Sequence, residues 1–207
     1  DNATTGARVT HFPVIHCRQG SLGYKLEWNG LSMIYTSDTK PEENSIAQAS
    51  NNGQGIDVLI HEMIVPAEIW AMKNQGLSQP GNDSDPMWAA TVAGLTAVQN
   101  SSHTPQGAFG YLLSRISPRP RLTVATHFPV ADDTVACALQ SVQAHCPDIR
   151  KIGDPLTWSF DLMVIRVFPD RIAQYRAAVS DFTFSPPIPD TPDDVYVPKY
   201  HTDTGAW

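Results

Sequence analysis

An aspartate and two histidines each stand just after a short apolar run of this chain. They are Asp38, His16 and His127, which follow the runs 31–35, 12–15 and 122–126. Short apolar runs bounded by turn residues predict buried strands, and side chains at strand carboxyl ends face the crevice in which α/β proteins bind ligands. Imidazole and carboxylate groups are ligands of zinc and similar divalent metals. These residues therefore predict a metal site.

Each of these residues also has a purely structural interpretation. An aspartate at a strand end commonly forms a turn or caps a helix, and a histidine there can be an ordinary hydrogen-bonded residue. The ordered set favours the metal site, because two further histidine motifs lie between Asp38 and His127. They are His61-Glu62, at the end of another apolar run, and His103, between Ser102 and Thr104.

The elements that must position these residues alternate between strands and helices. The expected strands are about 9–15, 21–28, 31–35, 56–60, 122–126 and 161–168. The expected helices are 42–50, 66–73, 88–98, one that starts at 102–106, 132–145 and 170–178. Asn29-Gly30, between the second and third strands, is the strongest short signal of a β-hairpin. The alternation predicts an α/β fold.

The composition excludes several classes of protein. The chain has 207 residues, of which 42% are hydrophobic and 17% charged, and these values are ordinary for a globular chain with a sizeable core. The formal net charge of −7 argues against non-specific binding to a nucleic-acid backbone, which needs clustered lysine and arginine. No uninterrupted apolar run is long enough to span a membrane. We therefore expect neither nucleic acid nor a membrane as a partner.

The three cysteines do not make a disulfide framework. Cys137 and Cys146 are near enough in sequence for a bridge, but two free buried thiols are an equal alternative, so the compartment stays open. We expect residues 1–182 to form one domain and residues 183–207, rich in proline and aspartate, to form a C-terminal tail.

Five short segments, taken in order, resemble the metallo-β-lactamase superfamily and, within it, the ribonuclease Z and arylsulfatase-like branch. They are Pro13-Val14-Ile15-His16-Cys17 with Gly23-Tyr24, Ser37-Asp38-Thr39, Leu59-Ile60-His61-Glu62, Ser102-His103-Thr104 and Thr126-His127-Phe128. Each segment alone is a weak signal, whereas five in this order make a specific one. The resemblance covers about residues 9–135 and implies a four-layer αββα sandwich.

The resemblance also implies a metal centre. His16 is similar to a ligand of one ion, Asp38 to the carboxylate that bridges two ions, and His127 to a ligand of the second. The implied cofactors are two divalent ions, zinc first, with manganese or iron as alternatives. Two neighbouring ions can share a hydroxide and stabilise both oxygens of a displacement, so Asp38 belongs to the implied catalytic set as well.

The same resemblance implies an accessory catalytic set of His103, Glu62 and His61. We expect His103 to give the leaving oxygen its proton, as a histidine can do near neutral pH. We expect Glu62 to set the tautomer of His103, and His61 to support the pair. In the alternative interpretation, His61 and Glu62 only anchor the strand end through hydrogen bonds.

One departure from the superfamily concerns the extent of the functional unit. The His-x-His-x-Asp-His motif, which supplies most of the remaining ligands and precedes the His16 segment, is absent from this sequence. We therefore expect the chain to be the C-terminal part of the fold, to bind metal poorly alone, and to expose a broad apolar sheet face. Its expected partner is the N-terminal part of the same fold, supplied as an absent segment, a separate chain or a cleaved precursor.

Other departures concern the substrate. Pro129 stands where the branch has a serine and offers no backbone donor to a phosphate, so we do not expect tRNA processing. Ser37 stands where the family usually has glycine. Residues 66–100 form an insert that either caps an apolar substrate pocket or packs as a helical pair. Its bulky apolar side chains include Trp70, Met72, Met87 and Trp88.

The sequence thus predicts a dinuclear metal-dependent hydrolase that uses a metal-bound hydroxide on a small or medium-sized ester. Relatives in the branch attack both phosphodiesters and sulfate esters, so these are the expected substrates. A lactonase or other carboxylic-ester hydrolase on the same site is one alternative. A binding protein that kept the fold and lost the metals is another. We expect a homo-oligomer.

Overall fold

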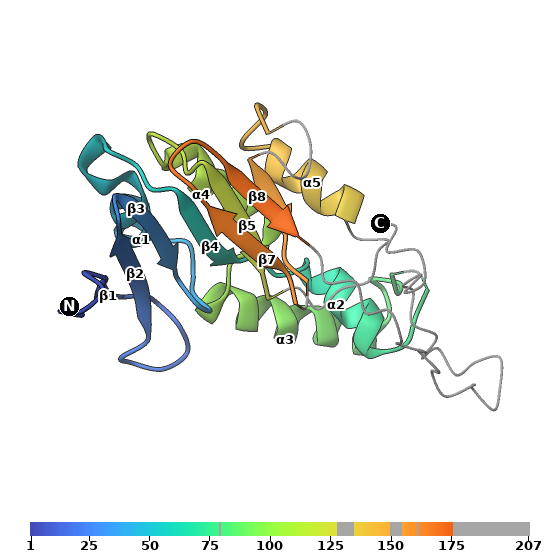
Figure 1. Ribbon diagram of the computed structural model, residues 1–207. Coiled ribbons are helices and arrows are strands. Elements are labelled where there is room, and N and C mark those ends of the chain that lie inside the picture. Colours follow the sequence, from blue (N-terminus) through green and yellow to red (C-terminus); the bar gives the residue numbers. More distant parts are fainter. Residues whose placement is uncertain (79, 128–134, 150–154, 161, 176–207) are drawn as a thin grey trace, which may run out of the picture.

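A mixed sheet forms the centre of the molecule (Figure 1). The computed structural model describes residues 1–78, 80–127, 135–149, 155–160 and 162–175, with only the backbone of 135–137. The strands of the large sheet are β1 (Arg8–Pro13), β2 (Leu22–Trp28), β3 (Leu31–Tyr35), β4 (Val58–Glu62), β5 (Leu122–Thr126) and β6 (Leu156–Trp158), in that order. The first three pair antiparallel, and β3 to β6 run parallel.

A tight turn at Asn29-Gly30 joins β2 to β3, as the sequence predicts. The two residues have φ angles of 51° and 74°, and Trp28 pairs with Leu31 across the turn. Two consecutive positive φ angles match the right-handed twist of paired strands, which is why Asn-Gly is favoured here. The turn fixes the pairing register of β2 and β3, and hence where β3 ends.

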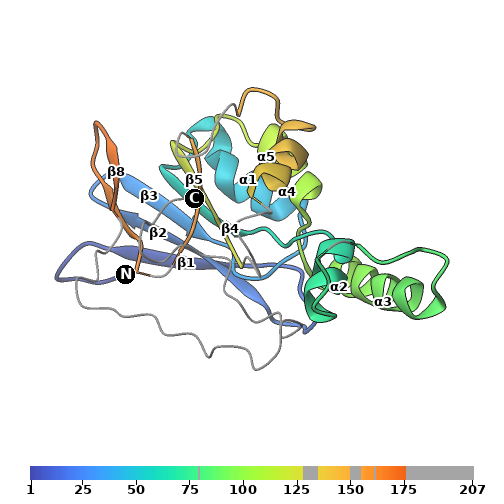
Figure 2. The ribbon, with the colours of Figure 1, turned by 90° about the vertical axis from the view of Figure 1, so that its right-hand side faces the viewer.

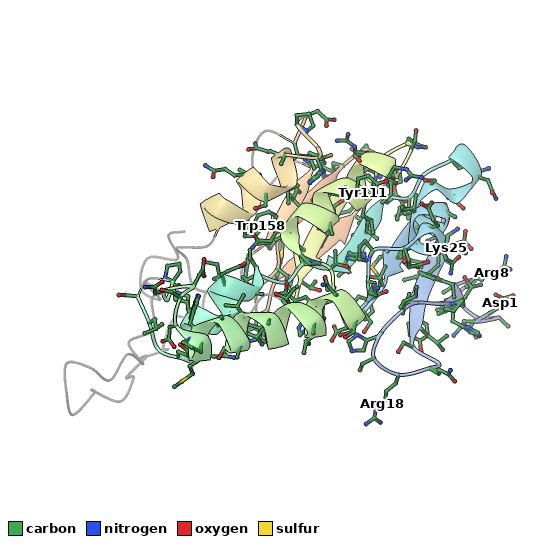
Figure 3. All side chains as sticks on the ribbon, turned by 180° about the vertical axis from the view of Figure 1, so that it is seen from behind. Asp1, Arg8, Arg18, Lys25, Tyr111 and Trp158 are labelled. Carbon is green, nitrogen blue, oxygen red and sulfur yellow. The ribbon has the colours of Figure 1, made fainter. Side chains whose placement is uncertain are left out.

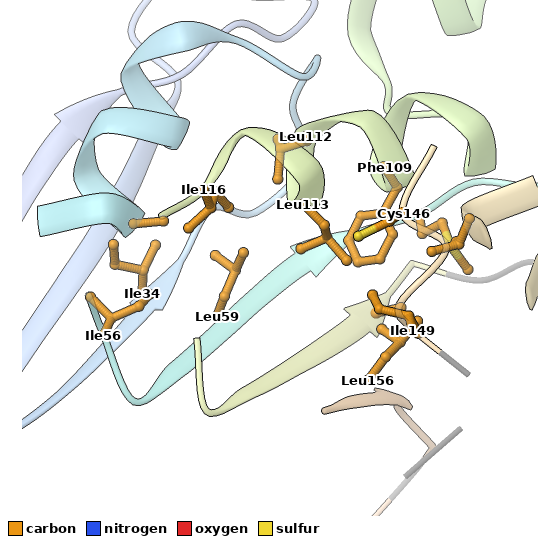
Figure 4. Close-up of a cluster of buried hydrophobic side chains, with 14 of the residues drawn as sticks. Ile34, Ile56, Leu59, Phe109, Leu112, Leu113, Ile116, Cys146, Ile149 and Leu156 are labelled. Atoms are coloured by element: carbon orange, nitrogen blue, oxygen red, sulfur yellow. The ribbon is translucent and has the colours of Figure 1, made fainter. Parts of the chain in front are cut away.

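Helices α1 (Glu43–Ser50), α4 (Gln106–Arg115) and α5 (Val135–Gln143) cover one face of the sheet, and Figure 2 shows them together on that side. A 3₁₀ turn, η1 (Asn51–Gly53), follows α1. Beneath the helices lies the main core, in which Ile34 and Leu59 of the sheet join Phe109 and Leu113 of α4 (Figure 4). Burial of this apolar surface holds α4 against the sheet.

A two-stranded sheet covers part of the opposite face. Its strands are β7 (Val164–Val167) and β8 (Ile172–Tyr175). Ile165, Val167 and Ile172 of this hairpin pack against the buried residues Val58, Leu122 and Val124 of β4 and β5. Helices, large sheet and small sheet thus form successive layers, and the predicted α/β fold is confirmed.

The rest of that face, over β1 to β3, is exposed except at Leu26 and Met33, which are partly buried, and we call it the open face. It consists of two cross-strand rows, which are His11–Tyr24–Tyr35 and Val9–Leu26–Met33. Val9 is 57% exposed, Tyr24 46% and Tyr35 41%, and neither row contains an acidic or basic residue other than His11. The described residues therefore show the broad apolar sheet face expected from the sequence.

Helices α2 (Ala67–Asn74) and α3 (Pro86–Ser102) form a pair that projects beyond the sheet (Figure 2). Met72 and Trp88 are buried between the two helices, so these side chains pack the pair, as in the second interpretation of the insert. Met87 is 72% exposed. Among the described residues, no helix is long and apolar enough to cross a membrane.

Two elements differ from the sequence prediction. Residues 172–175, expected in a helix over 170–178, form strand β8, because each of them pairs with a residue of β7. This pairing outweighs the local helix signal, and Ile172 and Tyr175 suit a strand. Strand β6 was not predicted, because three residues are too few to show a period.

Several other predictions fall partly or wholly outside the described residues. The helix expected over 132–145 is described from Val135 and ends at Gln143. Its first residues and the expected tail 183–207 lie outside the described residues, as does the beginning of the expected strand 161–168. Cys146 is a free, buried thiol, so the alternative of a disulfide bridge does not hold.

Candidate metal centre

Four strands end at the same edge of the large sheet. Strands β1 and β3 are both antiparallel to β2, so they run the same way, and β3, β4 and β5 are parallel neighbours. Polar residues at or just after these strand ends therefore meet. They are His16, Asp38, Glu62 and His127, and His103 joins them from the C-terminal end of α3.

Two groups of three side chains are close enough to hold a metal ion. One is His16, Glu62 and His103, and the other is Asp38, His103 and His127; in each, the ligand atoms lie within 4.8 Å of one another. The ring of His103 lies between the others, with centroids 5.1 Å from His16 and 5.3 Å from His127. Imidazole nitrogens with a carboxylate fit zinc or a similar divalent ion. The predicted ligands are neighbours, but they divide between two groups that share His103.

The orientation of His16 suits a metal ligand. Its Nδ1 lies 2.8 Å from the carbonyl oxygen of Ser102. Because a carbonyl oxygen can only accept, Nδ1 carries the proton, and Nε2 keeps its lone pair if the ring is neutral. Metal-binding histidines are commonly held in this way by a hydrogen bond at the other ring nitrogen.

His103 and Glu62 form a buried pair. Nδ1 of His103 lies 2.8 Å from Oε2 of Glu62, whose side chain is fully buried, and the backbone N–H of Thr39 donates to Oε1. Burial raises the pKa of Glu62 to about 8. Burial, then the nearby His127 and His16, lower the pKa of His103. Both shifts favour the uncharged forms near neutral pH.

Asp38 and His127 form the more exposed side of the site. Oδ2 of Asp38 lies 3.5 Å from Nε2 of His127. Ser37 and His127 have φ angles of 59° and 56°, a region that residues other than glycine seldom adopt. The backbone at Ser37 thus gives a physical reason for the glycine that is usual at this turn. The departure at Pro129 lies outside the described residues.

His61 lies apart from the other predicted catalytic residues. Successive side chains of a strand point to opposite faces, so Glu62 reaches the metal centre while His61 enters the main core against Phe109, with ring centroids 5.7 Å apart. Its Nδ1 lies 2.7 Å from the carbonyl oxygen of Glu62, and burial lowers its pKa to about 4. A supporting role for His61 stays a prediction.

Two threonines belong to the site, Thr39 without a predicted role and Thr104 predicted as a helix cap, although no side chain caps α4. Thr104 Oγ1 donates to the carbonyl oxygen of Thr39 at 2.6 Å, and Thr39 Oγ1 accepts from the backbone N–H of Ile15 at 3.1 Å. Both threonines are fully buried. They link the segments that carry His16, Asp38 and His103. The sequence signal that could have indicated this role is their position next to Asp38 and His103 in two of the five segments.

Comparison with known proteins gives a distant structural likeness. No family model matches the sequence, and no curated protein matches it. Among solved structures, the chain is similar to the metallo-beta-lactamase fold protein YhfI from Bacillus subtilis, with a TM-score of 0.46 and 11% sequence identity. The match covers 74% of this chain and 46% of that one, so this chain spans less than half of the length of that protein.

Proposed function

We propose that this chain carries part of the dinuclear metal centre of a hydrolase from the ribonuclease Z and arylsulfatase-like branch. The observation that carries the proposal is the convergence of His16, Asp38, Glu62, His103 and His127 at one sheet edge. Core packing does not require five ionisable side chains to gather at one sheet edge. Bound divalent ions would polarise an ester and activate water. His16, Asp38 and His127 would hold these ions.

In this proposal, His103 gives the leaving oxygen its proton. Glu62 fixes the ring through the 2.8 Å contact at Nδ1, which leaves Nε2 to face the substrate, and its carboxyl group can exchange a proton with the ring. Because His103 belongs to both groups of potential ligands, it also has the position of a metal ligand. The two roles predict different effects of a substitution.

Substitution of His103 by alanine separates these roles. If His103 is the proton donor, the variant keeps its metal content and loses about 10²–10⁴-fold in turnover. Loss of metal together with activity would make it a ligand instead. Unchanged turnover with intact metal content would remove His103 from the mechanism.

We propose phosphodiesters or sulfate esters as substrates, on the strength of the motifs that resemble the ribonuclease Z and arylsulfatase-like branch. A lactone or other carboxylic ester is the second candidate class, because the same ions would polarise a carbonyl. A screen of an aryl phosphodiester, an aryl sulfate and a lactone at matched concentrations distinguishes the classes. Hydrolysis of the lactone alone would overturn the first assignment.

We also propose that the functional unit contains the N-terminal part of the same fold, and that the unit forms a homo-oligomer. Two features of the described residues support a further polypeptide. Each of the two candidate groups offers three side chains and both share His103, so two ions with a coordination number of four or more would need further ligands. The open face offers uncharged, apolar surface to a second sheet, and sheets pack face to face through such surfaces.

The metal content of the native preparation tests the proposed function. We expect about two ions per copy of this chain, as in two-metal sites, with a second polypeptide or segment that carries a histidine-rich motif in the intact-mass spectrum. Asp38→Asn should lower the metal content, whereas Asp170→Asn, at an exposed carboxylate on the β7–β8 turn, should not. No metal and no companion would favour the metal-free binding protein.

A further inference from the structure

A second polar cluster lies on the core side of β4. His61 is fully buried, and Gln106, on α4, is 2% exposed. Neither Nε2 of His61 nor either polar atom of the Gln106 carboxamide has a hydrogen-bond partner in the described part of the chain. Buried polar groups are paired in the great majority of cases, with protein atoms or with ordered water. Three such atoms in two residues therefore require an explanation.

The strand register and the helix period place these groups in the same region. His61, Ala125 and Trp158 form one row across β4, β5 and β6, and Trp158, labelled in Figure 3, lies beside α4 and α5. Ala125, the neighbour of His61 in this row, has a small side chain. Phe109 packs over His61, and Gln106 precedes Phe109 by one helical turn on the same face of α4.

The start of α4 is tied to the end of β4. Ile64 forms a parallel bridge with Pro105, the residue before α4, and its N–H donates to the carbonyl oxygen of Thr104 at 2.9 Å. These contacts fix the first turn of α4 near the strand end that follows His61. Gln106 is therefore held at this position by the backbone.

The hydrogen bonds of His61 define what its second nitrogen needs. Nδ1 lies 2.7 Å from the carbonyl oxygen of Glu62, and because a carbonyl oxygen only accepts, Nδ1 carries the proton. With the proton on Nδ1, Nε2 of the neutral ring has a lone pair and is an acceptor. The carboxamide of Gln106 offers two donors and an acceptor. A water molecule can donate to Nε2 and still bond to Gln106.

We propose that His61 and Gln106 form an internal water-binding site between β4 and the first turn of α4. The bound water donates to Nε2 of His61 and completes the hydrogen bonding of Gln106. It thereby holds the imidazole in the orientation in which Nδ1 donates to the Glu62 carbonyl. The site uses no side chain of the candidate metal centre and only the backbone carbonyl of Glu62. The water site can therefore be tested independently of the proposed hydrolase activity.

A high-resolution crystal structure of the full chain tests the site directly. We expect an electron-density peak within about 2.6–3.2 Å of Nε2 of His61, and hydrogen-bonded directly or through a second water to Gln106. A direct hydrogen bond between the two side chains, or apolar atoms against Nε2, would overturn the proposal.

Nitrogen-15 NMR of the histidine rings provides a second test in solution. We expect Nε2 of His61 to resonate as an unprotonated, hydrogen-bonded nitrogen and to move toward the position of a free acceptor in Gln106→Leu. The matched control is Gln99→Leu, at another buried glutamine, whose Nε2 donates to the carbonyl oxygen of Val65 at 2.6 Å. An equal response to both substitutions, or no response to Gln106→Leu, would contradict the site. If Gln106→Leu fails to fold, the spectrum of the unmodified chain still tests the site, because an Nε2 of His61 that resonates as a free acceptor would contradict it.

Discussion

Two consecutive residues at the end of β4 show how burial acts on ionisable side chains. Glu62 turns toward the metal centre and His61 toward the core, because strand side chains alternate. Desolvation raises the pKa of Glu62 to about 8 and lowers that of His61 to about 4. In each case burial disfavours the charged form.

The shift at His61 predicts a pH-dependent stability. Its pKa of about 4 in the folded chain lies below the ordinary value of 6.5, so between these values the unfolded chain binds more protons. The contribution of His61 to the free energy of unfolding should therefore fall as the pH is lowered from 6.5 toward 4, whereas the raised pKa of Glu62 gives a contribution of the opposite sign. His61→Gln should remove this pH-dependent contribution to the free energy of unfolding, which is on the order of 3 kcal/mol.

Urea unfolding at pH 6.5 and 4.5 measures this effect. His11→Gln, at an exposed histidine of β1, is the control and should keep the pH dependence of the unmodified chain. If His61→Gln retains the same pH dependence as the unmodified chain, the buried neutral histidine does not contribute as described.

The hydroxyl of Thr104 should matter for stability and for the metal centre. Thr104→Val keeps the shape and removes the donor to the carbonyl oxygen of Thr39, which is then buried with one partner fewer. We expect a loss of about 1–3 kcal/mol and weaker zinc binding, measured by urea unfolding and by titration with zinc. Thr91→Val removes a hydroxyl that donates to the Met87 carbonyl oxygen and accepts from Gln75 Nε2, both at exposed positions, and should change the stability by about 0.5 kcal/mol or less.

At the scale of elements, the strand ends position the candidate ligands and the turns position the strands. The Asn29-Gly30 turn fixes the register of β2 and β3, so Asp38 follows β3 at the edge where β4 and β5 also end. Helix α3 brings His103 to the same edge, and a buried hydrogen bond from Gln99 Nε2 to the carbonyl oxygen of Val65 ties its last turns to the segment after β4.

Two glycine-to-alanine substitutions should have opposite effects. Gly30 has a φ of +74°, so Gly30→Ala should destabilise the chain by about 1 kcal/mol. Gly94 lies within α3, and a Cβ there would meet nothing within 4 Å, so Gly94→Ala should stabilise by up to about 1 kcal/mol. Thermal unfolding measures both. A lower melting temperature for Gly94→Ala would mean that something covers this part of α3.

At the scale of the whole molecule, the layers are unevenly covered. Helices cover one face of the large sheet, whereas on the opposite face the described residues of β7 and β8 cover β4 and β5 and leave the open face exposed. Exposed apolar areas of this kind mark interaction sites or cause association. The isolated chain should therefore bind an apolar fluorescent dye and self-associate.

The double variant Tyr24→Lys with Tyr35→Glu should reduce both properties. The two residues are cross-strand partners, so the new charges are opposite and tolerated in the sheet. Sedimentation velocity and dye fluorescence measure the effect. Met87→Lys, at an exposed methionine outside the open face, should change neither. Equal dye binding by the double variant and the unmodified chain would show that the open face is not the responsible surface.

The sequence by itself determined strands β1 to β5 and the types of residue at their ends. The expected runs 31–35 and 122–126 coincide with β3 and β5, because apolar runs bounded by turn residues report local burial. The turn at Asn29-Gly30 could also be predicted from local sequence, because its positive φ angles favour asparagine and glycine. The ordered motifs then named the candidate site residues that the structure brings together at one edge.

The tertiary structure alone decided which of these side chains meet. It divides the candidate ligands into two groups that share His103. It links Thr39 to Thr104 across 65 positions of sequence, and it makes residues 172–175 a strand through pairing with β7. These outcomes depend on contacts between segments distant in the chain, which no local period encodes. The same holds for His61 and Gln106, whose unpaired atoms become apparent only when the helix lies against the sheet.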